Sequence, residues 1–210
     1  FLVKGFIIGV VVSAPLGPVG VLCIQRTLNK GRWYGFVTGI GAALSDIIYS
    51  LLTGYGMSFI YDFIQRPSNV FYLQLVGSVM LFLFGLYTFR SNPVHALRPV
   101  SANKGTLVHN FLTAFFVTLS NPLIIFLFIG FFARFSFVLP GIPVYEQTLG
   151  YLAIFTGAIT WWFSITYFVN KVRTRFNLRG IWILNRVIGG IVIVASIAGF
   201  FGTLLGKSLY

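Results

Sequence analysis

The chain has 210 residues, of which 57% are hydrophobic and only 9% are charged. A soluble domain carries about 25% charged residues, so this chain lacks the polar side chains that would cover a water-facing surface. The composition therefore excludes soluble enzymes, disordered tails and secreted disulfide scaffolds. A single cysteine, Cys23, leaves no internal disulfide. We predict an all-α integral membrane protein with several spanning helices.

The formal net charge is +12, from 15 Lys and Arg residues and only three acids. In a soluble protein this excess would indicate nucleic-acid binding. Here the basic residues lie between apolar runs, where membrane topology and anionic lipid headgroups account for them. We therefore expect membrane lipids, and no nucleic acid, among the partners.

Six apolar segments are each about as long as a helix that crosses a bilayer, which needs roughly 20 residues. In chain order they cover residues 5–25, 34–57, 69–89, 107–132, 147–169 and 182–204. The connections between them are short, so we expect one membrane domain over residues 1–210 and no separate soluble domain.

The basic residues are divided unevenly between the two sides that these segments define. Eleven lie in or beside the first, third and fifth connections: Arg26, Lys30, Arg32, Arg90, Arg98, Lys104, Lys171, Arg173, Arg175, Arg179 and Arg186. The opposite side has four: Lys4, Arg66, Arg134 and Lys207. Basic loops face the cytoplasm, so we predict that these three connections are cytoplasmic and that both termini lie outside.

Two of the segments are interrupted near their middle. The first contains Pro15-Leu16-Gly17-Pro18-Val19-Gly20, and the fourth contains Ser120-Asn121-Pro122. Proline removes a backbone donor and frees a carbonyl one turn earlier, which membrane proteins tolerate only inside protein or beside a watery cavity. Breaks at corresponding positions predict a binding site, where the helix that begins near Pro18 attracts a carboxylate. The alternative is that the prolines only kink packed helices.

The two halves of the chain, about 5–89 and 107–204, share this pattern of interruptions. Residues 41–46 of the second segment and 157–162 of the fifth occupy the same place in their halves, and both begin with small residues. Because each half has three spans, the second half must enter the membrane from the opposite face. We therefore predict two inverted three-helix repeats, an arrangement that recurs in secondary transporters.

Asp46 is the only acidic residue deep inside a predicted span, since Asp62 and Glu146 fall in predicted external loops. A charge at the bilayer centre costs about 2.5–3.5 kcal/mol, so a function for this carboxyl is the default hypothesis. The carboxyl group can bind a proton or a cation but not both, and this exclusive binding is the minimum that antiport requires. The alternative is a structural contact with Ser45, Tyr49 or a neighbouring helix.

Several other side chains are candidates for the same site. Asn121 could bind substrate at the second break or cap the helix that follows it. Residues that could line the pathway are Ser45, Tyr49, Trp161 and Trp162. His95 and His109 have no acidic, thiol or imidazole neighbours at ligand spacing, so we expect no metal site and no cofactor.

The motifs resemble those of the lysine exporter (LysE) family of bacterial amino-acid efflux proteins. The resemblance rests on Pro15-Leu16-Gly17-Pro18, on residues 26–32, on Ser45-Asp46, on Leu119-Ser120-Asn121-Pro122, and on six apolar segments in a chain of this length. One departure is that Leu16 separates Pro15 from Gly17, whereas many members have Pro-Gly-Pro without interruption.

The resemblance implies a carrier in the bacterial inner (cytoplasmic) membrane that exports amino acids or related small solutes with an ion gradient, and no enzymatic activity. The substrate-binding residues would be Pro15, Gly17, Pro18, Gly20, Asn121 and Pro122, with Asp46 coupling to the proton. Alternatives are a heavy-metal or other cation exporter of the same superfamily, a membrane enzyme, and a scaffold without transport, which predicts a packed core and no midplane cavity. A homo-oligomer is compatible with the sequence.

Overall fold

The computed structural model describes residues 2–58, 67–92, 105–138, 142–172 and 178–205. This part of the chain is all helical. Its helices are α1 (Leu2–Ser13), α2 (Pro18–Lys30), α3 (Arg32–Ser58), α5 (Pro67–Arg90), α6 (Leu107–Leu119), α7 (Leu123–Phe135), α8 (Val144–Lys171) and α9 (Leu178–Leu204). Asp62, Arg66, His95, Arg98, Lys104, Arg173, Arg175 and Lys207 lie outside the described residues. The predicted all-α class is confirmed.

Each predicted segment coincides with one long helix or with a pair of shorter ones. Four helices (α3, α5, α8 and α9) are long and apolar enough to cross a membrane. The pairs α1–α2 and α6–α7 pass the same test together and are bent by 77° and 68°. The described residues therefore contain four to six candidate spans, and the predicted breaks in the first and fourth segments are confirmed.

One predicted boundary is wrong. Glu146 was expected in an external loop, but α8 begins at Val144 and places Glu146 in its first turn. The position suits an acid, because the N-terminal end of a helix carries partial positive charge. Pro143 lies directly before the helix and has no backbone N–H group, so this position leaves no donor that needs a hydrogen-bond partner.

Close helix contacts join the two halves of the chain. Helix α1 packs along α8, and α6 packs along α3. Both contacts depend on glycine: a Cβ atom at Gly9 would collide with the carbonyl oxygen of Ile154, and one at Gly41 with that of Phe111. Small residues at these points let the backbones approach, as they do in other membrane helix pairs.

The breaks divide the interior into two hydrophobic clusters. One is built around Phe128 and Phe132 of α7 and includes Ile8 of α1. The other is built around α2, with Ile24 packed near Trp162 of α8. The first bent pair contributes α1 to one cluster and α2 to the other, so its bend lies between the clusters.

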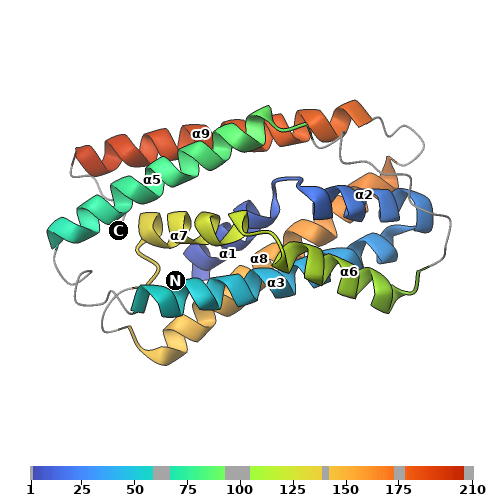
Figure 1. Ribbon diagram of the computed structural model, residues 1–210, viewed down its shortest axis with the longest axis horizontal. Coiled ribbons are helices and arrows are strands. Elements are labelled where there is room, and N and C mark those ends of the chain that lie inside the picture. The colour runs from blue at the N-terminus through green and yellow to red at the C-terminus, as the bar shows by residue number, and fades with distance from the viewer. Residues whose placement is uncertain (1, 59–66, 93–104, 139–141, 173–177, 206–210) are drawn as a thin grey trace.

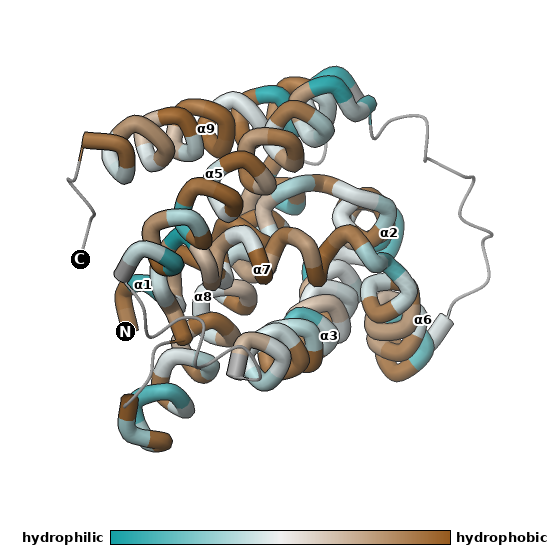
Figure 2. Tube along the Cα trace, turned by 60° about the vertical axis from the view of Figure 1, so that its left-hand side comes forward, coloured by the Kyte–Doolittle hydropathy of each residue, from teal (hydrophilic) through white to brown (hydrophobic). Residues whose placement is uncertain are grey.

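Helices α5 and α9 lie side by side along one edge of the bundle (Figure 1). Their outward faces carry large exposed apolar side chains, among them Val76, Leu83, Val187 and Ile191. Hydrophobic residues run along most of the length of both helices (Figure 2). Such a surface suits contact with lipid rather than water. The beginning of α1 and the end of α9 lie at the same end of the bundle (Figure 1).

Candidate functional site

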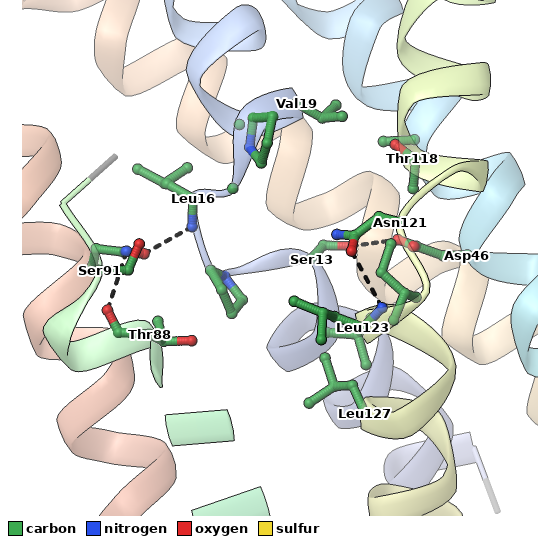
Figure 3. A pocket seen from close by; sticks show the side chains of 18 of the residues that line it. Ser13, Leu16, Val19, Asp46, Thr88, Ser91, Thr118, Asn121, Leu123 and Leu127 are labelled. Atoms are coloured by element: carbon green, nitrogen blue, oxygen red, sulfur yellow. Dashed lines mark hydrogen bonds between the residues drawn. The ribbon is translucent and has the colours of Figure 1, made fainter. Parts of the chain in front are cut away.

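The two bends face a common cavity of about 320 Å³. This volume is near the lower end of the range for small-molecule sites, about 300–1,000 Å³. The predicted site residues that line it are Pro15, Gly17, Pro18, Gly20, Asp46, Asn121 and Trp162. Figure 3 shows the cavity between the two interrupted helices. Residues from both halves of the chain therefore meet at one place.

The first bend presents backbone donors to the cavity. The amide of Gly17 donates to the carbonyl of Pro15 at 2.9 Å, which forms the turn, and the amide of Val21 makes the first helical bond of α2, to Gly17 at 3.1 Å. The amides of Val19 and Gly20 precede that bond, so they have no acceptor within the helix. Both residues line the cavity, and the N-terminal end of α2 therefore directs donors and partial positive charge toward it.

Asp46 is buried at the cavity wall, with 4% of its surface exposed. Its Oδ2 atom accepts a hydrogen bond of 3.1 Å from the hydroxyl of Ser13, the last residue of α1 (Figure 3). In the described part of the chain it forms no ion pair with a basic residue. A buried carboxyl without a counter-charge is costly, so a mobile cation or a proton is its natural partner.

The second bend is held by Asn121. Its Oδ1 atom accepts a hydrogen bond of 3.2 Å from the amide of Leu123, the first residue of α7 (Figure 3). The side chain therefore caps this helix and also lines the cavity. Pro122 precedes α7 with helical backbone angles (φ −66°, ψ −17°) and is not among the lining residues, so it shapes the bend.

The remaining candidates are divided between the cavity and the helix contacts. Trp162 lines the cavity, whereas Trp161 does not. Ser45 donates to the carbonyl of Phe115 at 2.7 Å, and the hydroxyl of Tyr49 donates to the carbonyl of Leu119. Both bonds join α3 to α6 away from the lining, where they stabilise the helix contact.

Sequence reasoning missed Asn185, which is buried in α9 with 2% exposure. Its Oδ1 atom accepts from the amide of Leu16 at 2.9 Å, and its Nδ2 atom donates to the carbonyl of Thr88 at 3.2 Å. The residue thus ties the first bend to α5 and α9. A signal existed, because Asn185 is the only amide side chain in the apolar segment 182–204.

Two broken helices that enclose a small cavity within an all-α bundle are an architecture that recurs in secondary transporters. The chain belongs to the LysE type translocator family, whose family model matches residues 10–204. This match confirms the resemblance drawn from the motifs. The family it identifies is one of membrane transporters and not of enzymes.

Individual relatives agree with this assignment. The chain is 30% identical over 128 residues to the "Putative amino acid efflux protein YcgF" of Bacillus subtilis (strain 168), which covers 60% of this chain and 59% of that protein. It is 28% identical over 177 residues to the "Uncharacterized membrane protein YahN" of Escherichia coli (strain K12), covering 80% and 75%. The matched part therefore spans less than two thirds of the first relative's length. No solved structure matches the chain.

A further match is to a protein of a different kind. The chain is 26% identical over 126 residues to Protein TIC 214 of Adiantum capillus-veneris, which covers 60% of this chain and 7% of that protein. This similarity is confined to a small part of a much longer protein.

Proposed function

We propose that this translocator exports amino acids or related small solutes in exchange for protons. The observation that carries the proposal is the cavity in which an unpaired buried carboxyl, Asp46, lies between two helix breaks. The printed name of the Bacillus subtilis relative, an amino acid efflux protein, supports the same substrate class.

The cavity offers partners for both charged groups of an amino acid. The free amides at the start of α2, at Val19 and Gly20, are donors suited to a carboxylate. The Asp46 carboxylate is an acceptor suited to an ammonium group. Asn121 contributes a polar contact from the second half of the chain. Substrate is therefore held between the two bends, with each half of the protein in contact with it.

Coupling follows from competition for one carboxyl group. When Asp46 holds a proton it is neutral and has no charge to pair with an ammonium group. When substrate ammonium pairs with the carboxylate, the proton has left to the solution on that side. A proton entering from outside displaces substrate, and substrate from inside displaces the proton. One carboxyl is enough for this exchange, provided that the cavity opens to each side in turn.

Helix packing supports two inverted repeats that move against each other. Helix α1 of the first half packs along α8 of the second, and α6 of the second half packs along α3 of the first. The two contacts are counterparts under the predicted repeat. A second pair is unequal: α5 packs along α7, but α9 makes no comparable contact with α2 among the described residues. This inequality between the two helix contacts supports a carrier in a conformation that is closed on one side.

We also propose that the ends of α2 and α8 and the beginnings of α3 and α9 face the cytoplasm of a bacterial cell. The supporting observation is that basic side chains at this end lie against aromatic rings. The guanidinium of Arg32 is 4.1 Å from the ring centre of Phe163, and that of Arg186 is 4.0 Å from the ring centre of Trp182. Paired basic and aromatic residues are typical of the membrane–water interface. In this orientation α7 and α5 close the outer side.

The decisive test uses purified protein in liposomes loaded with a mixture of labelled amino acids. We expect an imposed proton gradient to drive release through the unmodified protein and not through Asp46→Asn. Asparagine has nearly the same shape and still accepts the Ser13 hydrogen bond, but it cannot exchange a proton. Glu146→Gln, which removes an acid outside the cavity, is the matched control and should retain release. Equal gradient-driven release by Asp46→Asn would remove this carboxyl from the mechanism.

A further inference from the structure

The hydroxyl of Thr118 is a buried polar group without a partner. The residue is 4% exposed, and its Oγ1 atom has no hydrogen bond in the described part of the chain. It lies at the end of α6, one turn before Asn121, and lines the cavity (Figure 3). Buried hydroxyls almost always have a partner, so one without a partner at a cavity wall indicates a bond made to a bound molecule.

Other hydroxyls in this protein show how unusual Thr118 is. On the same helix, Thr113 donates to the carbonyl of His109, four residues earlier, at 2.6 Å. Thr166 of α8 and Thr203 of α9 make the same kind of bond, at 2.7 and 3.0 Å. This local bond is the default for threonine in a helix. The hydroxyl of Thr118 does not make it.

Thr118 also lies at the level of Asp46. Helices α3 and α6 pack in a constant register in which Gly41 faces Phe111 and Ser45 bonds to Phe115, 70 positions later. In this register Asp46 is level with residue 116. Thr118 is two residues further on, or about 3 Å along the helix axis. Thr118 and Asp46 therefore line one cavity from adjacent helices at nearly the same height.

The rest of the lining limits the charge of the ligand. Asp46 is the one charged residue among the described residues that line the cavity. Apolar side chains form much of the remaining wall, including Phe84 of α5. Leu123 and Leu127 of α7 also belong to it (Figure 3). One ammonium group has a counter-charge here. The substrate's own carboxylate has the amides at the start of α2, whereas a further charge on its side chain, of either sign, would be buried without a counter-charge, at a considerable cost in free energy.

From these observations we propose that the cavity selects amino acids with uncharged, apolar side chains, and that Thr118 hydrogen-bonds the substrate carboxylate while Asp46 pairs with its ammonium group. The side chain of the substrate lies against Phe84, Leu123 and Leu127. Lysine, arginine and glutamate are disfavoured, because each brings a further charge. This inference rests on the proposed function and specifies its substrate class.

Exchange in liposomes tests the substrate class. Vesicles loaded with unlabelled leucine take up labelled leucine by exchange, and other compounds are added outside as competitors. We expect phenylalanine to compete at a concentration about ten times lower than lysine or glutamate. Burying one charge without a counter-charge reduces affinity by at least about this factor. Lysine that competes as well as phenylalanine overturns the proposed selectivity while leaving amino-acid export in place. If no amino acid exchanges, the proposed function fails, and this inference with it.

Thr118→Val tests the hydroxyl, because valine has the shape of threonine without the donor. We expect the half-saturating concentration of leucine to rise about tenfold, the usual effect of removing a donor to a charged group. Competition by isopentylamine, which is leucine without its carboxylate, should stay unchanged. Thr113→Val is the control on the same helix and should alter neither. An unchanged leucine affinity, or an equal loss for isopentylamine, overturns the role of Thr118.

Discussion

Asn185 is the residue whose loss should cost the most stability at the site. It joins the first bend to α5 and α9 through two hydrogen bonds, one from the amide of Leu16 (2.9 Å) and one to the carbonyl of Thr88 (3.2 Å). The substitution Asn185→Leu keeps the size of the side chain and removes both bonds. The amide of Leu16 and the carbonyl of Thr88 then remain buried without these partners.

The magnitude follows from the two groups left unpaired. Each buried polar group that loses its partner costs about 1–3 kcal/mol, so the free energy of unfolding should fall by about 2–6 kcal/mol. For a chain of this size, even the lower figure corresponds to a decrease of roughly 4 °C in Tm. Exchange activity should also fall, since the bend that holds the free amides of α2 is no longer fixed.

Thermal unfolding of the purified protein in detergent measures this effect. Asn170→Leu is the matched control, because Asn170 is exposed on α8 and its replacement should change the unfolding free energy by less than about 0.5 kcal/mol. If Asn185→Leu unfolds at the same temperature as the unmodified protein, the two bonds do not stabilise the bend.

Two further outcomes are expected. In a Cys23→Ser background, Leu81→Cys with Gly130→Cys should form a disulfide between α5 and α7, because a Cβ atom at Gly130 lies 3.2 Å from the Leu81 side chain. Oxidation should stop exchange and reduction restore it; exchange that continues through the cross-linked protein would show that this contact does not open. Gly9→Val should prevent accumulation of folded protein, since the new side chain meets the backbone of α8, whereas Gly17→Ala, with no atom within 4 Å of its Cβ, should accumulate normally.

The local features of this protein were predictable because their causes lie within a few residues. A run of about 20 apolar residues has no stable place except a membrane span or a buried core. Prolines at 15, 18 and 122 interrupt the helices in which they occur, whatever surrounds them. Asp46 stood out for the same kind of reason, since it is the only acid within an apolar segment.

The residues that were missed or placed differently depend on contacts between distant parts of the chain. Ser45 and Tyr49 are near Asp46 in sequence, yet they bond to α6 because they occupy another face of α3. In the sequence Thr118 does not differ from other helical threonines, and only the structure shows that its hydroxyl lacks the usual hydrogen bond to the preceding turn. Asn185 acquires its role only from Leu16, which is 169 positions away.

Composition and proline placement alone were thus sufficient to establish helices in a membrane, two of them broken, with one acid among apolar residues. Whether the breaks meet, and what they enclose, depended on how helices from opposite halves of the chain pack. That packing is controlled by glycine contacts such as Gly9 with Ile154 and Gly41 with Phe111. Such contacts join residues 70 or more positions apart. The periodicity of a single helix does not indicate which other helix packs against it.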